Sequence, residues 1–360
     1  MKKIKVRLGK SGYEIYMGSG LLAQVGRRLK ESGFSDKLVI ITNPVVERLY
    51  GEALGQKLIS EGFRVTTLLV PDGEEQKSLE NAGRLYHELS NFYAERTTPI
   101  LALGGGVIGD LAGFVAATYL RGVPLVHVPT TLLSHVDSSI GGKVAVNHGQ
   151  LKNTIGAFYQ PRLVISDVST LKTLPPREMS NGLAEVIKSA VIRDEDFFTY
   201  LEKNLDYITA LDFGELEEVV SRTAKIKAEV VEEDERDLGL RNILNYGHTI
   251  GHAIESVTDF KVGHGKAVAI GMIAAAKISN KLGILDIKEL ARLRDLIKRA
   301  NLPTKIADLD IGRIIQTMSH DKKIVAGKIR FVLPKTIGDV FITDEVSLSL
   351  VEQVLVDWNE

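Results

Sequence analysis

Short apolar runs in the first half of the chain alternate with stretches whose apolar residues recur at helical spacing. Helical patterns such as Val46–Glu61 and Leu79–Tyr93 separate the apolar runs. The runs that read as buried strands are Lys37–Thr42, Val65–Val70, Pro99–Leu103, Pro124–Val128 and Leu163–Asp167. Strand and helix in alternation, with turn residues at the joints, are typical of a parallel sheet covered by helices. The pattern therefore predicts an α/β domain.

The pattern changes after Thr170. Two consecutive prolines interrupt the chain, and beyond them apolar residues recur every three or four positions, as in Ala267–Leu282. This spacing is typical of amphipathic helices. We therefore predict a parallel-sheet α/β domain over residues 1–170 and a mainly α-helical domain over residues 171–360. Two late apolar runs predict a small hairpin inside the helical half, Ile329–Leu333 and Val340–Thr343.

Composition places the chain among ordinary globular proteins. Its 360 residues are 44% hydrophobic and 25% charged, which excludes a disordered or fibrous protein. No apolar run approaches the roughly 20 residues that span a bilayer. Near the start, Ile4, Val6 and Leu8 alternate with polar residues, which is the pattern of a strand and not of a signal peptide. We expect a cytoplasmic protein with no membrane partner.

Charge and cysteine content limit the partners and the metal chemistry. The 45 basic and 46 acidic residues leave a formal charge of −1, whereas a nucleic-acid-binding protein usually shows a basic excess. We therefore expect no nucleic-acid partner, and an anion site would need local clustering of Lys and Arg. The chain has no cysteine, which excludes disulfides and thiolate ligands. A transition metal would be held by histidine and carboxylate.

Glycines directly follow one predicted strand. The run that ends at Leu103 continues into Gly104-Gly105-Gly106, and a helical pattern begins there. Glycine lets the backbone approach an anion closely, and a helix N-terminus offers free N–H groups, so a dinucleotide pyrophosphate suits this loop. The spacing is not GxGxxG, so a simple tight turn is the alternative.

Two other strand ends carry polar residues. Asp72–Lys77 follows one strand, and Thr130-Thr131 follows another. Both segments are explained equally by turn and cap chemistry and by a ligand-binding edge, because open α/β sheets bind ligands at the carboxyl ends of their strands.

Histidines cluster in the helical half. Only eight are present, and three fall within Asn245–His264. His248 and His252 share a helical face at i and i+4, and His264 lies in a glycine-flanked turn. Three imidazoles without cysteine indicate a divalent metal such as zinc, and hydrogen bonding across a helix interface is the alternative. Spacing alone favours His248 and His252 as ligands, although no HExxH motif supports that pair.

Several charged residues have an ordinary explanation. Glu185 and Lys188 lie three residues apart, which predicts an exposed ion pair on a helix. Each of the basic residues that stand out in the sequence is, taken alone, most simply a surface charge: Arg121, Lys143, Lys152, Lys227 and Arg241. Only a shared pocket would make these residues an anion site.

Five segments in order carry a resemblance to a known family. They are Gly104–Asp110, Pro129–Lys143, Asn181–Lys188, Arg241–His252 and His264–Met272. Together they resemble the 3-dehydroquinate synthases, which are sugar phosphate cyclases, and the likeness runs over nearly the whole chain. It implies an N-terminal Rossmann-like NAD domain and a helical C-terminal domain that binds metal and substrate.

The resemblance assigns roles to individual residues. It makes Glu185, His248 and His264 the ligands of zinc or cobalt, so that His252 becomes a residue of the substrate pocket. NAD would contact Asp72, Gly73, Glu74, Glu75, Gln76, Lys77, Gly106, Val107, Ile108, Gly109, Asp110, Thr130, Thr131, Lys143, Lys152, Thr170, Leu171, Lys172 and Thr173. Catalysis would use Lys143, Lys188, Lys227, Arg241, Asn245 and His252, and the substrate would also contact Arg121, Asp137, Asn153 and a late lysine, with Lys322 favoured over Lys323.

The implied activity is that of a phosphorus–oxygen lyase of the shikimate pathway. A seven-carbon sugar acid phosphate would be oxidised transiently by NAD, lose phosphate, be reduced again and close to 3-dehydroquinate by an intramolecular aldol step. Lys and Arg suit the two anionic groups of such a substrate. The family resemblance also implies a homodimer. The alternatives are a metal-dependent glycerol or glycerol-1-phosphate dehydrogenase, a cyclase for a substrate without the carboxylate, and a non-catalytic regulator.

Overall fold

The computed structural model describes residues 1–149, 151–305, 310–319 and 329–357. Its contacts divide the chain into two units. The first comprises Met1–Leu174 and Leu216–Arg236, and the second comprises Pro175–Glu215 and Asp237–Glu360. The first division lies close to the residue where the sequence pattern changes. The return of Leu216–Arg236 to the first unit has no counterpart in that pattern, because a helix looks the same in sequence whichever unit it packs against.

A seven-stranded sheet forms the centre of the first unit, in the order β1-β2-β9-β6-β5-β3-β4. The strands are β1 (Lys2–Val6), β2 (Tyr13–Gly18), β3 (Lys37–Thr42), β4 (Arg64–Leu69), β5 (Ile100–Gly104), β6 (Leu125–Pro129) and β9 (Leu163–Asp167). All neighbouring pairs are parallel except β1 and β2. The five predicted strands and the parallel sheet are therefore confirmed. The prediction that all five are buried is wrong for β4, which lies at the edge of the sheet and has only Leu68 buried.

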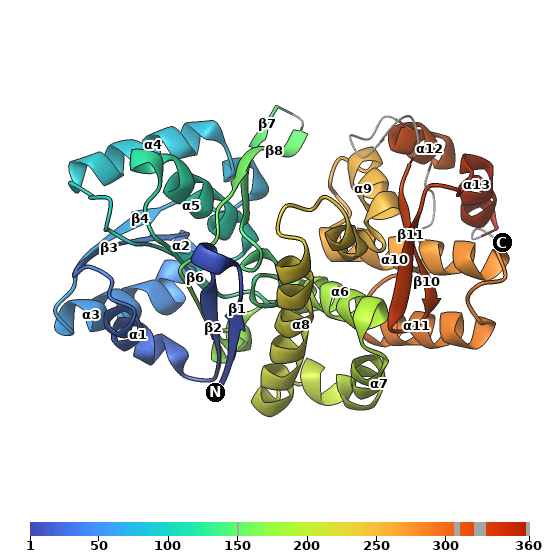
Figure 1. The fold of residues 1–360 in the computed structure, drawn as a ribbon, viewed down its shortest axis with the longest axis horizontal. Helices are drawn as coiled ribbons and strands as arrows, with labels where there is room; N and C mark the ends of the chain where they lie inside the picture. The colour runs from blue at the N-terminus through green and yellow to red at the C-terminus, as the bar shows by residue number, and fades with distance from the viewer. Residues whose placement is uncertain (150, 306–309, 320–328, 358–360) are drawn as a thin grey trace. The chain divides into compact units, whose positions relative to one another are not determined.

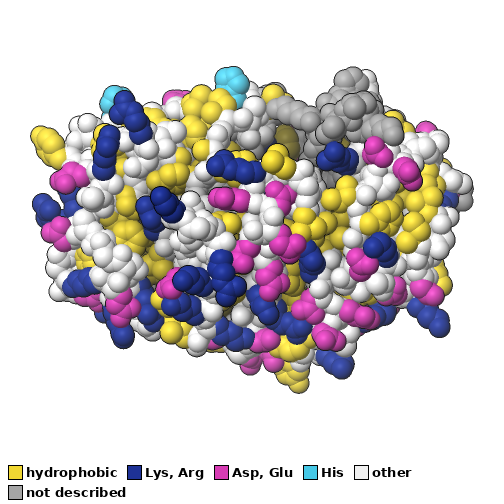
Figure 2. Space-filling model, viewed as in Figure 1, with side chains coloured by type: hydrophobic (Ala, Val, Ile, Leu, Met, Phe, Trp, Pro, Cys, Tyr) yellow, Lys and Arg dark blue, Asp and Glu magenta, His cyan; other side chains and the backbone are white. Residues whose placement is uncertain are grey.

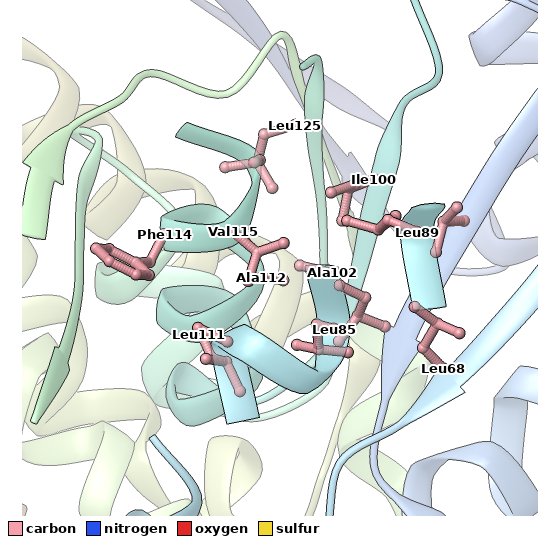
Figure 3. Packing of buried hydrophobic residues seen from close by; sticks show 14 of the residues in the cluster. Leu68, Leu85, Leu89, Ile100, Ala102, Leu111, Ala112, Phe114, Val115 and Leu125 are labelled. Carbon is pink, nitrogen blue, oxygen red and sulfur yellow. The ribbon is translucent and has the colours of Figure 1, made fainter. Parts of the chain in front are cut away.

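Helices cover both faces of this sheet (Figure 1). On one face α1 (Val25–Glu31) and α3 (Glu52–Ser60) pack on the strands, and on the other α4 (Leu79–Asn91) and α5 (Gly106–Thr118) do so. Side chains alternate between the faces, so Leu38 and Ile40 belong to one cluster and Val39 and Ile41 to the other. Figure 3 shows Leu111, Ala112 and Val115 of α5 packed toward β5 and α4. This burial holds α5 against the sheet, with its first residue at Gly106, the last of the three glycines.

Further elements complete the first unit. The helix before α3 starts as α2 (Pro44–Val46) and passes through one π-helical turn, Glu47–Gly51. An antiparallel hairpin, β7 (Lys143–His148) and β8 (Leu151–Phe158), packs on α5 and has no strong sequence signal. Most of α8 (Phe213–Glu233) also belongs here. The backbone N–H of Arg7 donates to Glu232 Oε1 at 2.7 Å, which ties this helix to the start of the chain.

The second unit is built on α10 (His264–Lys281), whose apolar side chains are almost all buried. It packs against α6 (Pro176–Arg193) and α9 (His248–Val257) and against the strand β10 (Phe331–Thr336). The predicted hairpin is confirmed, because β10 pairs with β11 (Asp339–Thr343) in antiparallel register. The remaining helices are α7 (Glu195–Thr209), α11 (Ile287–Arg299), α12 (Ile311–Ser319) and α13 (Leu348–Val356).

Charged side chains of both signs are interspersed over the face shown in Figure 2, as the balanced charge count leads one to expect. Within the described parts of the chain, no helix combines the length and the apolar character that crossing a membrane would need.

Candidate active site

Three potential metal ligands from three helices meet in the second unit. Glu185 lies in the middle of α6, and His248 and His264 are the first residues of α9 and α10. One ligand atom from each lies within 4.8 Å of the others. The first turn of α10 is held against α6 because the Gly265 N–H donates to Asn181 Oδ1 at 2.5 Å. This contact fixes His264 beside the turn of α6 that carries Glu185.

The distances between these atoms fit a metal centre better than hydrogen bonds. Glu185 Oε1 lies 3.6 Å from Nε2 of His248 and 3.6 Å from Nε2 of His264. Ligands about 2.1 Å from a tetrahedral cation are separated by roughly 3.4 Å. Glu185 Oε1 is buried, and no donor among the described residues satisfies it. A buried carboxylate oxygen facing two imidazole nitrogens at this spacing is suited to a divalent cation.

The other ring nitrogens are held so that Nε2 is presented to this point. His248 Nδ1 lies 3.1 Å from the backbone carbonyl oxygen of Tyr246, and His264 Nδ1 lies 3.4 Å from Glu255 Oε2. Both acceptors favour the tautomer with the proton on Nδ1, which leaves the Nε2 lone pair for a cation.

Burial and charge set the protonation of the group. Glu185 and Lys188 are only 1% and 3% exposed, so the prediction of an exposed ion pair is wrong. Burial alone would raise the pKa of Glu185, but the ammonium of Lys188 and the neighbouring His264 outweigh it and lower the pKa to about 2. Burial likewise lowers the pKa of His264, but the Glu185 and Glu255 carboxylates raise it to about 10. Glu185 is therefore ionised at neutral pH, and its carboxylate is suited to a cation.

Close backbone packing fixes the start of α9. Gly271 on α10 faces Gly247, and a Cβ added to Gly271 would lie 1.9 Å from the Gly247 carbonyl oxygen. Gly247 itself has φ of 78°, in the left-handed region that favours glycine. His248 follows directly, so this contact determines where its ring can lie.

The remaining predicted residues of the second unit lie in the same segments. Arg241 and Asn245 belong to the 3-10 segment Leu240–Asn245, which precedes α9, and Arg241 is 2% exposed. The His252 ring centroid lies 5.1 Å from that of His248 and 6.2 Å from that of His264. The structure thus groups all three histidines. It places His252 with Glu255 and His264 as a second set of nearby ligand atoms, not with Glu185.

The predicted nucleotide-binding segments of the first unit all follow carboxyl ends of parallel strands. Asp72–Lys77 comes after β4, the glycines after β5, Thr130-Thr131 after β6, and Thr170–Thr173 after β9. A Cβ on Gly105 would lie 3.1 Å from Thr131 Cγ2, and one on Gly106 would lie 3.3 Å from Ser138 Oγ. A side chain at either position would press on these neighbours, so glycine suits the start of α5, where a helix N-terminus can meet a phosphate.

A buried lysine connects three predicted site segments. Lys77, 4% exposed, forms an ion pair with Asp110 on α5 and a hydrogen bond with Asn153 on β8. Burial raises the pKa of Asp110, and the charge of Lys77 opposes this rise. The hairpin is also attached by its backbone, because the Asn147 N–H donates to the Lys77 carbonyl oxygen at 2.8 Å. The β7–β8 hairpin therefore brings Asn153 to the Asp72–Lys77 segment.

Other predicted residues of the first unit differ in accessibility. Lys227 on α8, 8% exposed, donates to Asp137 Oδ1 at 2.6 Å and to the Asp137 carbonyl oxygen at 2.7 Å. Leu171 is fully buried, so only its backbone is available to a ligand. The residues with exposed side chains are Asp72, Glu75, Arg121, Lys143, Lys152, Asn153, Lys172 and Thr173. Lys322 and Lys323 lie outside the described residues.

Sequence reasoning missed residues that hold these segments. The Tyr50 hydroxyl donates to the Thr170 carbonyl oxygen at 2.9 Å, and His135 Nε2 lies 3.0 Å from Thr170 Oγ1. Neither Tyr50 nor His135 has a local sequence signal for this role. Glu255 is different, because it follows His252 by three residues on the same predicted helical face.

Comparison with known families decides the relationship. Residues 67–181 match the family described as 3-dehydroquinate synthase N-terminal, and residues 182–324 match 3-dehydroquinate synthase C-terminal. The chain belongs to the 3-dehydroquinate synthase family. It is 53% identical to the 3-dehydroquinate synthase of Dehalococcoides mccartyi over 346 residues, which are 96% of each chain.

Two solved structures of related synthases share the fold. A 2-deoxy-scyllo-inosose synthase complexed with carbaglucose-6-phosphate, NAD+ and Co2+ is 28% identical, with a TM-score of 0.91 over 99% of this chain and 100% of that one. The 2-epi-5-epi-valiolone synthase of Streptomyces hygroscopicus subsp. jinggangensis 5008, with NAD+ and Zn2+ bound, is 27% identical, with a TM-score of 0.89 over 96% of both. These relatives are named as synthases and give the dehydrogenase alternative no support.

Proposed function

We propose that this member of the family is itself a 3-dehydroquinate synthase. It converts 3-deoxy-D-arabino-heptulosonate 7-phosphate to 3-dehydroquinate and phosphate, with transient oxidation by NAD and no net redox change. The identity of 53% to a named 3-dehydroquinate synthase, against 27–28% to cyclases of other names, supports this substrate.

One structural observation carries the proposal. Glu185 Oε1 is buried, has no donor among the described residues, and faces two imidazole nitrogens at 3.6 Å each. A divalent zinc or cobalt ion bound by Glu185, His248 and His264 would act as a Lewis acid on a substrate hydroxyl and stabilise its alkoxide. The residues present fit such an ion in number, chemistry and spacing.

Basic residues of the second unit suit the anionic groups of the substrate. Lys188 and Arg241 are 3% and 2% exposed, and a buried cation interacts strongly with an anion because little water screens the pair. The guanidinium of Arg241 is suited to a carboxylate or phosphate, since it can donate two parallel hydrogen bonds. Asn245, from the same 3-10 segment as Arg241, and His252, on α9, add neutral donors and acceptors for hydroxyl groups.

In the first unit, the strand ends and the α5 N-terminus hold NAD, which accepts and returns a hydride in each turnover. Asp72–Lys77, Gly106–Asp110, Thr130-Thr131 and Thr170–Thr173 provide its contacts, with Lys143 and Lys152. Lys227 is held by Asp137, so its ammonium is oriented before a substrate arrives. Arg121 and Asn153 complete the predicted substrate contacts, and the late lysine, Lys322, is proposed from the sequence alone.

A turnover assay with a catalytic amount of NAD tests the proposal. The metal-loaded protein, NAD at one tenth of the substrate concentration and the seven-carbon phosphate are mixed, and phosphate, 3-dehydroquinate and NADH are followed together. We expect phosphate and 3-dehydroquinate to form in equal amounts, well beyond the NAD supplied, without NADH accumulation. Stoichiometric NADH would indicate a dehydrogenase, and absence of turnover would contradict the proposal.

A second substrate separates this activity from that of the other cyclases. Glucose 6-phosphate carries a phosphate and no carboxylate, so it leaves part of the cationic site unused. We expect its kcat/KM to be lower by at least about two orders of magnitude, as for a lost charged contact. Equal efficiency with both substrates would assign the chain to a different cyclase activity.

We extend the proposal to the location and assembly that the family resemblance implies, which are the cytoplasm and a homodimer. Fractionation of the source cells tests the first, and light scattering on the purified protein tests the second. A monomeric mass at micromolar concentration would contradict the homodimer.

A further inference from the structure

The two imidazoles that face Glu185 are held by acceptors of different charge. The acceptor for His248 Nδ1 is a neutral backbone carbonyl, that of Tyr246, at 3.1 Å. The acceptor for His264 Nδ1 is the carboxylate of Glu255, at 3.4 Å from Oε2. Glu255 lies near the end of α9 and is 6% exposed. A carboxylate this buried is costly unless it meets a partner that donates to it.

We propose that Glu255 is a positioning residue for the metal ion, acting through His264 without touching the ion. By accepting the Nδ1 proton it fixes the tautomer in which Nε2 carries the lone pair. It also orients the ring, and its negative charge makes the imidazole a stronger donor. The proposal rests on the metal site of the proposed function and adds a residue that the sequence analysis did not select.

The position of Glu255 on α9 supports this role. It follows His248 by seven residues, which is two helical turns, so the same helix that provides one ligand also holds the second ligand, on α10. Packing of α9 on α10 therefore sets both imidazoles at once. The pair Glu255–His264 links the far end of α9 to the first residue of α10 across the loop that joins them.

Charge balance points the same way. Glu185 and Glu255 together carry two negative charges, which match a divalent cation. With Lys188, the metal-loaded group then has one net positive charge, which suits an anionic substrate. Without Glu255 the metal-loaded site would hold a larger net positive charge in a buried place, which disfavours binding of the cation.

A second metal ion is the competing explanation, because His252, Glu255 and His264 also bring ligand atoms within 4.8 Å of one another. A cation there would have to bind Nδ1 of His264 while Nε2 faces Glu185. One imidazole can bind two cations only after losing its remaining proton. A proton shared between His264 Nδ1 and Glu255 requires no such ionisation, so the positioning role is favoured.

The test compares Glu255→Gln and Glu255→Ala with Glu289→Gln. Glu289 is a matched control in the same unit, since its Oε1 accepts from Thr336 and from the Ile337 N–H and it belongs to neither ligand set. Zn2+ affinity is measured by competition with a chelator, and the Co2+-loaded proteins are examined by visible absorption. We expect Zn2+ binding to weaken about tenfold in Glu255→Gln and up to about 100-fold in Glu255→Ala. The control keeps wild-type affinity.

The visible absorption bands of bound Co2+ report on its ligands, so a general packing defect would not shift them. We expect the absorption bands of both Glu255 variants to shift, because the donor strength of His264 changes, while those of Glu289→Gln stay in place. If Glu255→Ala fails to fold, the nearly isosteric Gln variant decides. Unchanged Zn2+ affinity and an unchanged Co2+ spectrum in Glu255→Gln would overturn the inference.

Metal stoichiometry separates this inference from the proposed function. One Zn2+ per wild-type chain supports both. Two per chain, with one lost in Glu255→Gln, would replace the positioning role by a second metal site. A wild-type chain that binds no divalent metal would instead contradict the proposed function itself.

Discussion

Lys188 and Glu185 lie one turn apart on α6 and form an ion pair with 3% and 1% of their surfaces exposed. The ammonium pairs with Oε2, while Oε1 faces the Nε2 atoms of His248 and His264. The two oxygens of one carboxylate thus have separate tasks. Oε2 binds the Lys188 ammonium, and Oε1 points to the position that a metal ion would occupy between the two histidines.

Removal of the ammonium is expected to make stability dependent on metal. In Lys188→Met the Glu185 carboxylate loses its charge partner while remaining buried, which typically costs about 3 kcal/mol of unfolding free energy. Zn2+ supplies a new partner, so addition of the metal should recover most of this loss. Denaturant unfolding of the metal-free and Zn2+-loaded variant measures both effects.

The control for this prediction is Lys281→Met, which removes an exposed ion pair with Asp357 in the same unit. Such a pair contributes less than about 1 kcal/mol, and zinc should not alter the effect. Equal losses in the two variants, or no recovery with Zn2+ in Lys188→Met, would contradict a charge role for Lys188 at the metal site.

The contact between α9 and α10 is expected to control metal binding. In Gly271→Ala the new methyl group would lie 1.9 Å from the Gly247 carbonyl oxygen, so the start of α9 must move and carry His248 with it. We expect a loss of about 3 kcal/mol in unfolding free energy and weaker Zn2+ binding. Calorimetry and chelator competition measure the two effects.

Gly55→Ala is the matched substitution for this prediction. Gly55 lies in α3 with no atom within 4 Å of an added Cβ, and its backbone is helical. Alanine at this position should raise the unfolding free energy of the protein by roughly 0.5–1 kcal/mol without changing its metal affinity. Wild-type Zn2+ binding in Gly271→Ala would show that the helix contact does not position His248.

The central strands of the sheet were predictable from sequence because they are continuous apolar runs. Two of these strands are buried on both faces, Ile100–Gly104 and Leu163–Asp167. Short apolar runs of this kind are typical of the central strands of a parallel sheet. The β7–β8 hairpin was not predictable, since β8 is almost wholly exposed and lacks an apolar pattern. Its position depends on long-range contacts, such as the bond from Asn147 to the Lys77 carbonyl oxygen.

The local sequence pattern gave wrong predictions for the candidate site where the answer depends on how the helices pack. The i,i+3 spacing of Glu185 and Lys188 is the same for an exposed pair and for one enclosed between helices, so the sequence could not distinguish them. Likewise, the i,i+4 pattern favoured His248 and His252 together. The structure places Glu185 Oε1 nearer to His248 and His264, because α6 and α10 meet through Asn181. That helix contact has no local signal.

Acid is expected to destabilise the first unit through His135. Burial lowers the pKa of His135 to about 3, and the charge of Asp167 opposes this only partly. The ring is held between Ser166 Oγ and Thr170 Oγ1. Because the folded-state pKa lies below the unfolded value, the unfolded chain takes up the proton first. Stability is therefore complete above about pH 6.5 and falls as the pH drops toward 3.

The magnitude follows from linkage. Between pH 7 and pH 5 this residue alone should remove about 2 kcal/mol of unfolding free energy. His135→Gln keeps an amide donor and acceptor but cannot titrate, so its stability should fall by that much less over the same interval. Parallel pH dependences for wild type and variant would show that His135 is protonated equally in both states.

The basic residues are expected to serve turnover and not folding. Lys143→Ala and Arg241→Ala should each lower kcat/KM by about two orders of magnitude, the effect of losing a charged contact to substrate. Zn2+ affinity and circular dichroism should stay at wild-type values. Near-normal rates in both variants, measured by phosphate release, would remove the proposed anion site.

Anomalous diffraction from crystals grown with Co2+ tests the central claim most directly. The account predicts one strong peak per chain, about 2.1 Å from Glu185 Oε1 and from the Nε2 atoms of His248 and His264. A strong peak elsewhere, or none at full Co2+ loading, would contradict the metal site on which the proposed chemistry depends.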